Sequence, residues 1–207
     1  MIPNEHIPQA LPALCDAELF ERFLDGDNNS YTALYRRYNA RVLGYIQSLL
    51  GTENQAADDI FQETFIRLYR ERNRARKPGS SPLQNVGGWL FRVARNLSLN
   101  QIRSQNYLTE IPQGYTEQLV TPVDEAYPEF FGHALEEEEL LRKVHAVVGS
   151  LPLPLREVFV LREINGMSYE ETVEILGCSM EAARMRLSRA RSAIRRALNP
   201  TPDNVSE

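Results

Sequence analysis

Six arginines without an acidic neighbour occupy residues 182–198 of the chain. They are Arg184, Arg186, Arg189, Arg191, Arg195 and Arg196. A solvated helix face ordinarily pairs opposite charges at a spacing of four residues, and this segment has no Asp or Glu. The planar guanidinium group donates two parallel hydrogen bonds to a phosphate or to a guanine edge. The pattern therefore favours nucleic-acid binding over a merely solvated surface.

The charge is distributed unevenly along the rest of the chain as well. Residues 62–104 carry a net charge of +7, residues 105–141 carry −9, and residues 182–198 carry +6. The total of −5 over 207 residues argues mildly against a polyanionic partner when it is taken alone. Resolved along the sequence, it indicates two basic faces separated by an acidic connector.

Catalytic and metal-binding chemistry has no comparable signal. Cys15 and Cys178 form no CxxC pair, and the three histidines are scattered. No nucleophile–base pair, glycine-rich phosphate loop or metal-ligand spacing is evident, so we expect no enzyme activity, no cofactor and no metal. No apolar run approaches the roughly 18 residues of a membrane span, and the first residues do not read as a secretory signal. We therefore expect a cytoplasmic protein without membrane insertion.

Helical periodicity predicts the elements that carry the first basic segment. Helices are expected over residues 30–50 and 54–72, preceded by a shorter helix that Asp16 or Asp27 caps. The prolines and glycines of residues 77–88 predict a loop. A further helix is expected over residues 89–103. We expect its core to comprise Trp89 and the apolar stripe Leu90, Val93, Ala94 and Leu97. Its opposite face carries Arg92, Arg95, Asn96, Leu99, Asn100 and Arg103.

Helical patterning fades after residue 104 and resumes near Leu135. It stops at Gly149–Pro152, restarts through Val158, Phe159, Leu161 and Ile164, and breaks again at Asn165-Gly166. These breaks predict two helices before Ser168.

The arginine-rich segment is the second helix of a predicted helix-turn-helix. Ser168 and Glu171 form a Ser-x-x-Glu capping box at the start of the first helix. Residues 177–179 supply the turn, and residues 180–198 supply the second helix. Its buried side is expected to comprise Ala183, Leu187, Ala190 and Ile194. A second helix of this kind enters the major groove with its N-terminal residues at the base edges, although such helix pairs also occur in proteins that never touch DNA.

The fold class that follows is all-α, with two small helical domains joined by a flexible acidic linker. The expected division is a tail at 1–17, an N-terminal domain at 18–104, the linker at 105–137, a C-terminal helix-turn-helix domain at 138–199 and a tail at 200–207.

Three ordered motifs resemble those of bacterial RNA polymerase sigma factors of the extracytoplasmic-function type. Residues 151–191 resemble their C-terminal domain, in particular Gly166-Met167-Ser168-Tyr169-Glu170-Glu171 and Arg186-Leu187-Ser188-Arg189-Ala190-Arg191. Asp58-Asp59-Ile60-Phe61-Gln62-Glu63-Thr64-Phe65 resembles the helix that binds core polymerase, and residues 89–97 resemble the promoter-reading helix. The resemblance covers roughly residues 18–104 and 138–198.

This resemblance implies a transcription initiation factor that binds core RNA polymerase, directs it to promoters and helps to open the DNA. The implied contacts with the minus-ten element are Asn85, Arg92, Arg95, Asn96, Asn100 and Arg103. Those with the minus-thirty-five element are Ser179, Arg184, Arg186, Ser188, Arg189 and Arg191. Those with core polymerase are Asp59, Gln62, Glu63, Phe65 and Ile66.

The resemblance also implies partners and a location. The partners are the clamp of the largest polymerase subunit, the flap of the second-largest subunit, promoter DNA and an anti-sigma factor. The protein is expected in the cytoplasm, associated with the nucleoid when it is part of the holoenzyme. The linker acids either mimic nucleic acid in a basic polymerase channel or only keep the linker extended. A stand-alone helix-turn-helix regulator and a helical module that does not bind DNA are the alternative readings.

Overall fold

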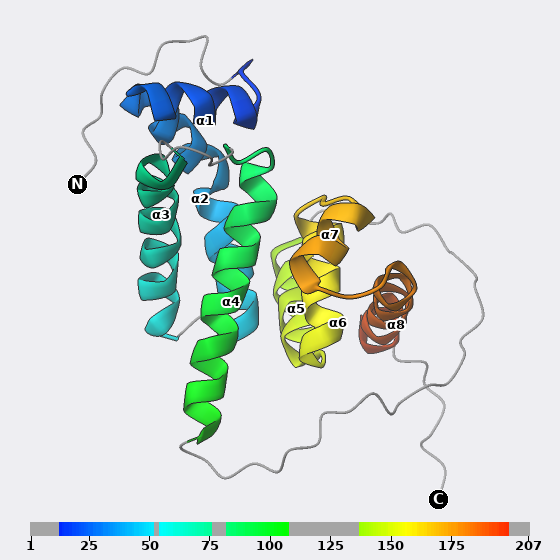
Figure 1. Cartoon of the computed structure of the whole chain (residues 1–207). Helices are drawn as coiled ribbons and strands as arrows, with labels where there is room; N and C mark the ends of the chain where they lie inside the picture. Colours follow the sequence, from blue (N-terminus) through cyan, green and yellow to red (C-terminus); the bar gives the residue numbers. More distant parts are fainter. Residues whose placement is uncertain (1–12, 52–53, 76–81, 108–136, 199–207) are drawn as a thin grey trace, which may run out of the picture. The chain divides into compact units, whose positions relative to one another are not determined.

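The computed structural model of the chain describes residues 13–51, 54–75, 82–107 and 137–198. These residues form helices and no β-strand, which confirms the predicted all-α class (Figure 1). The chain divides into two compact units, Met1–Gln105 and Asn106–Glu207. Most of the predicted linker at 105–137, including Leu135, lies outside the described residues, and so does the whole tail at 200–207.

The first unit contains α1 (Asp16–Asp25), α2 (Asn28–Leu50), α3 (Ala56–Ala75) and α4 (Val86–Tyr107). Figure 1 shows α1 lying across the end of the longer helices. The predicted cap of the first helix is wrong: Asp27 caps α2 instead, where its carboxylate accepts from the Asn29 N–H at 2.9 Å. Cys15 precedes α1, so this helix begins inside the predicted N-terminal tail.

Much of the core of the first unit is formed by apolar residues that recur every three or four positions along α2. Leu34, Tyr38, Val42, Tyr45 and Leu49 of α2 are all buried. They pack with α1 and α3. The rings of Tyr45 and Phe91, the latter in α4, meet edge-on with their centroids 5.3 Å apart.

The start of α4 differs from the prediction. The loop was expected to run through Gly88, yet α4 begins at Val86. Asn85 explains the earlier start, because its Oδ1 accepts from the Gly88 N–H at 2.7 Å and its carbonyl accepts from the Trp89 N–H at 3.0 Å. Gly87 is required here, since a Cβ at this position would lie 2.6 Å from the Tyr38 hydroxyl.

The buried face of α4 is also rotated from the predicted stripe. Leu90 and Ala94 are buried as expected, but Val93, Leu97 and Trp89 are only half-buried. The core positions that replace them are Val86, Phe91 and Ser98. The contact of Phe91 with α2 sets this rotation.

The second unit contains α5 (Glu137–Ser150), α6 (Leu153–Phe159), the π-helical turn η2 (Val160–Ile164), α7 (Tyr169–Leu176) and α8 (Met180–Leu198). The predicted break at Gly149–Pro152 is confirmed. The expectation that Ile164 continues the apolar pattern is wrong, since Ile164 is 55% exposed. A π-helical turn contains more residues than an α-helical turn, so the α-helical spacing no longer places Ile164 on the buried face.

Candidate nucleic-acid interface

The arginine-rich helix α8 is seated on the second unit by the predicted apolar stripe. Ala183, Leu187, Ala190 and Ile194 are all buried. The turn before α8 follows Gly177, which adopts the left-handed conformation at φ 65° that ends α7. The hydroxyl of Ser179 accepts from the Ala182 N–H at 3.1 Å and so caps α8. The predicted DNA contact Ser179 therefore has a local structural role.

The polar side chains predicted for the minus-thirty-five element emerge from α8 to different extents. Arg184 and Ser188 are exposed, whereas Arg186, Arg189 and Arg191 are half-buried. Arg191 has an acidic partner, contrary to the prediction that these arginines are unpaired. Its Nη2 lies 2.7 Å from Oε1 of Glu163 in η2, which the residues 182–198 alone could not show.

Arg184 lies close to the first residue of α7. Its guanidinium carbon is 5.6 Å from the centroid of the Tyr169 ring, and that of Arg162 is 4.1 Å from the same centroid. Ser168 fixes the start of α7 through the predicted capping box: its hydroxyl accepts from the Glu171 N–H at 3.1 Å, and the Glu171 carboxylate accepts from the Ser168 N–H at 2.8 Å. Tyr169 is a residue of this surface that the sequence analysis did not single out.

The pKa values of two carboxylates near Arg184 are lowered. The Glu170 N–H and the Ser168 hydroxyl hold the pKa of Glu170 below its usual value, and the charges of Arg162 and Arg184 add to this effect. At the start of α8, the Glu181 N–H and the Ser179 hydroxyl lower the pKa of Glu181 in the same way. Negative charge at these positions agrees with the positive N-terminal end of a helix.

The polar face predicted for the minus-ten element lies on one side of α4. Asn96, Asn100 and Arg103 are exposed, and Arg92 and Arg95 are half-buried. These positions lie opposite the core positions of the same helix, so the rotation of the core does not bury them. Asn85 stands at the start of this helix, where its side chain serves as the cap described above.

Only part of the predicted polymerase-binding face of α3 is exposed to solvent. Asp59, Gln62 and Ile66 are exposed, and Glu63 pairs with Arg67 at 2.8 Å. The hydrogen bond from Arg67 lowers the pKa of Glu63.

Phe65 does not belong to that surface. It is 4% exposed, and its ring packs against Tyr35 at 4.9 Å and Phe61 at 5.1 Å. An exposed aromatic residue of α3 that the sequence analysis missed is Tyr69, which is 46% exposed. Its spacing of three residues from Ile66 is the signal that places both on one side of the helix.

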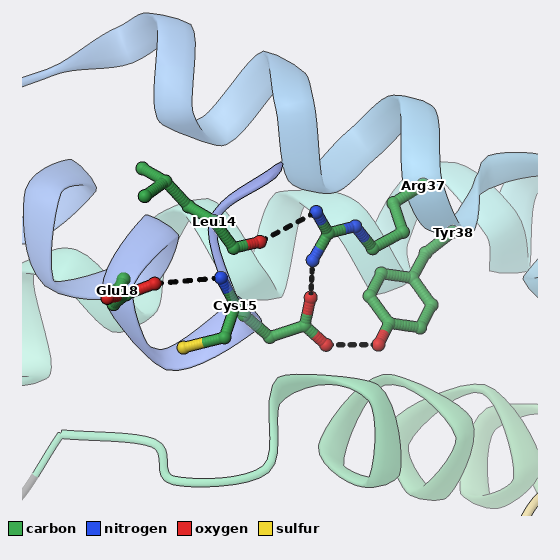
Figure 2. A network of polar contacts seen from close by, with 6 residues as sticks. Leu14, Cys15, Glu18, Arg37 and Tyr38 are labelled. Atoms are coloured by element: carbon green, nitrogen blue, oxygen red, sulfur yellow. Dashed lines mark hydrogen bonds and ion pairs between the residues drawn. The ribbon is translucent and has the colours of Figure 1, made fainter. Parts of the chain in front are cut away.

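A polar network in the first unit joins α1 to α2 (Figure 2). The Asp16 carboxylate accepts hydrogen bonds from the Arg37 guanidinium and from the Tyr38 hydroxyl. A second Arg37 nitrogen donates to the Leu14 carbonyl at 2.9 Å. Burial and the hydrogen bond to Asp16 raise the pKa of Tyr38. The partners lie 21 and 22 residues apart, so helical spacing does not reveal them.

Neither a metal site nor a membrane span is found in the described part of the chain. Among those residues, no three His, Cys, Asp or Glu side chains gather as metal ligands would. Over the same residues, no helix is both long and apolar enough to cross a bilayer. Cys15 is exposed and Cys178 is half-buried, and both are free thiols.

Comparison with known proteins identifies the family. Residues 34–107 match Sigma-70 region 2, and residues 141–194 match Sigma-70, region 4. The chain is 32% identical over 197 residues to the RNA polymerase sigma-H factor of Pseudomonas aeruginosa. This match covers 89% of this chain and 94% of that protein. It is 33% identical over 199 residues to the ECF RNA polymerase sigma-E factor of Escherichia coli K12. This match covers 90% of this chain and 96% of that protein.

The fold is similar to that of two proteins solved in complexes. The structure of CnrH in complex with the cytosolic domain of CnrY matches with a TM-score of 0.59 at 24% identity, over 88% of this chain and 96% of that chain. The sigma factor RpoE in complex with the anti-sigma factor NepR from Bartonella quintana matches with a TM-score of 0.58 at 21% identity, over 81% of this chain and 96% of that chain. The chain therefore belongs to the RNA polymerase sigma factors of the extracytoplasmic-function type, which direct RNA polymerase to promoters.

Proposed function

We propose that this sigma factor reads its promoter with two helices, one from each unit: α8 for the minus-thirty-five element and α4 for the minus-ten element. The observation that carries the proposal is the register of α8. Its buried stripe, Ala183, Leu187, Ala190 and Ile194, leaves Arg184 and Ser188 exposed in the N-terminal half of the helix. Helix-turn-helix proteins read base edges from this part of their second helix.

The side chains of α8 have different tasks in this proposal. Arg184 reads a base edge, for which guanine is the chemical match because its O6 and N7 accept both donors of a guanidinium fork. Ser188 lies one turn further along the same exposed side. Arg186, Arg189 and Arg191 hold phosphates of the flanking backbone, which positions the helix without selecting sequence.

The first unit supplies the minus-ten contacts. Arg92, Arg95 and Arg103 bind phosphates of the separated strand, and the amides of Asn96 and Asn100 bind base edges. Asn85, at the N-terminal end of α4, contributes to the capture of an extruded base. Base capture offsets the few kcal/mol that unstacking costs.

Binding to polymerase is assigned to α3 and to the second unit. Asp59, Gln62, Glu63 and Ile66 dock on the clamp of the largest subunit, and the C-terminal domain meets the flap of the second-largest subunit. Phe65 supports this surface from the core, because it is buried. In the proposed division, residues 18–104 and 138–199 are the working domains, and residues 105–137 connect them.

An anti-sigma factor regulates the protein in this proposal, and the holoenzyme acts at the nucleoid. The solved sigma factor complex with an anti-sigma factor, which shares the fold, supports the former. Family membership supports the latter, because a sigma factor acts where RNA polymerase meets DNA.

Transcription in vitro tests the proposal. Core RNA polymerase, with and without the chain, is given a promoter library with a randomised upstream element, and transcripts are sequenced. We expect new start sites only with the chain. Arg184→Ala should weaken preference at one base-pair position by about 1–3 kcal/mol. Arg196→Ala removes the same charge from an exposed position near the end of α8 and should lower binding evenly across sequences.

Two results would overturn the proposal. One is the absence of both new start sites and a complex with core polymerase. The other is tight, sequence-specific DNA binding by the chain alone, unchanged by polymerase, because that behaviour belongs to a stand-alone regulator.

A further inference from the structure

Tyr169 attracts two arginines from two different elements. The guanidinium carbon of Arg162, in η2, lies 4.1 Å from the ring centroid, and that of Arg184, in α8, lies 5.6 Å from it. Both distances are within the roughly 6 Å at which a cation interacts favourably with an aromatic face. The ring therefore links the π-helical turn to the helix that reads DNA.

The ring itself is held in place. Tyr169 is the first residue of α7, and the capping box of Ser168 and Glu171 fixes the backbone at this point. Arg162 is fixed as well, because its Nη1 donates to the Met167 carbonyl. Tyr169 and Arg162 are both half-buried, whereas Arg184 is exposed. The cluster thus joins two half-buried side chains to one long, exposed side chain, which also interacts electrostatically with Glu170 and Glu181.

We propose that Tyr169 is a positioning residue that determines promoter specificity, because its ring holds the Arg184 guanidinium in the position from which it reads a base. The inference rests on the proposed function, which assigns the base contact to Arg184. An aromatic ring suits this task better than a carboxylate. The ring attracts the cation without accepting the hydrogen bonds of its planar N–H donors, so the donors remain available for guanine.

Preorganisation has a recognisable consequence for selectivity. An exposed arginine loses rotamer freedom when it binds a base, and a side chain already held in position loses less. The interaction with the ring therefore favours the position of the Arg184 guanidinium in which both of its donors bind the correct base. Without the ring, Arg184 keeps its charge and still attracts phosphate, so general affinity for DNA should change less than selectivity.

The test uses holoenzyme assembled from core RNA polymerase and the full chain, with the randomised upstream library as the probe. The position read by Arg184 is first identified as the one at which Arg184→Ala loses preference. At that position, we expect Tyr169→Leu to lower the preference by about two- to fivefold. Tyr169→Phe, which keeps the ring and lacks the hydroxyl, should restore it. In the Arg184→Ala background, Tyr169→Leu should cause no further loss there.

Each other outcome overturns the inference in a distinct way. If Tyr169→Leu lowers preference equally at all positions, the ring only supports the fold. If Tyr169→Phe loses as much as Tyr169→Leu, the hydroxyl acts and not the ring. If Arg184→Ala loses preference and Tyr169→Leu does not, the inference fails and the proposed function stands. If Arg184→Ala loses preference nowhere, the base contact assigned to Arg184 fails and the inference fails with it.

Discussion

Replacement of Tyr38 by phenylalanine tests how the first unit is held together. The hydroxyl of Tyr38 donates to the Asp16 carboxylate and so ties α2 to the start of α1 (Figure 2). Tyr38 is 6% exposed, and Gly87 at the start of α4 approaches the same hydroxyl. The substitution removes one atom that contacts two helices and leaves the ring in place.

The contacts of Asp16 set the magnitude. A hydrogen bond to a charged group contributes about 1.5–3 kcal/mol to stability. Asp16 keeps its ion pair with Arg37 after the substitution, and its side chain is 23% exposed, so water can replace part of the lost bond. We therefore expect a loss of about 1.5–2 kcal/mol, at the lower end of that range. A unit of about 100 residues loses roughly 4–8 °C in Tm for each kcal/mol.

Trp89 provides a selective assay. It is the only tryptophan in the sequence and lies in α4, so its fluorescence follows unfolding of the first unit in the full chain. Urea unfolding of Tyr38→Phe, Asp16→Ala and the double variant forms a double-mutant cycle, and the two changes should cost less together than the sum of their separate effects. The control is Tyr35→Phe, which changes a half-exposed tyrosine of the same helix. Its free energy of unfolding should stay within about 0.5 kcal/mol of the wild-type value.

The reasoning is refuted if Tyr38→Phe is as stable as the control. It is also refuted if the effects of Tyr38→Phe and Asp16→Ala are additive, because additivity means that the hydroxyl and the carboxylate do not interact.

Three further predictions follow from single contacts. Ser168→Ala removes the cap of α7 and should destabilise the second unit by about 1 kcal/mol in thermal unfolding followed by circular dichroism. Glu163→Gln neutralises the carboxylate that pairs with Arg191, so the phosphate contact proposed for Arg191 should strengthen and the DNA affinity of the holoenzyme, measured over a range of salt concentrations, should rise. Burial raises the pKa of Tyr31 from its ordinary value of 10.0 to about 12. Its contribution to stability is therefore complete below pH 10 and is lost as the pH rises from 10 to 12, which unfolding titrations of the first unit measure.

Each of these has a matched control. Ser192→Ala, within α8, should leave stability nearly unchanged, and an equal loss in both serine variants contradicts a capping effect. Arg191→Ala should abolish the gain of affinity from Glu163→Gln, and a gain that persists means that Arg191 is not its source. Tyr31→Phe cannot ionise, so it should reduce the loss of stability between pH 10 and 12. An identical pH profile would assign that loss to other groups.

The sequence predicts best what depends on neighbours within one helical turn. The capping box at Ser168 and the buried stripe of α8 both follow from spacings of three and four residues, and both are confirmed. The end of α7 at Gly177 is equally local, because the left-handed conformation of one residue causes it.

Features that depend on contacts between distant segments were missed or misassigned. The family resemblance assigns Phe65 to the polymerase-binding surface. Its spacing of four residues from Phe61 places it on the apolar side of α3 instead, and the rings of α2 and α3 cover it. The core face of α4 turns toward Phe91 because of Tyr45, a residue of another helix. Arg191 finds its partner 28 residues earlier in the chain. Propensity and periodicity contain no information on such contacts.

The π-helical turn bears on how recognition helices are exchanged between sigma factors. A π-helical turn is equivalent to one residue inserted into an α-helix, and Asn165 closes it with hydrogen bonds to the Val160 carbonyl at 2.9 and 3.0 Å. Deleting one residue from 160–164 would let α6 continue as an α-helix. Every later residue would then turn by about 100° and move by about 1.5 Å relative to α6. On a recipient whose helix lacks this turn, a graft that begins at α7 would therefore present α8 in the wrong orientation, whereas one that begins before Val160 brings the required geometry with it.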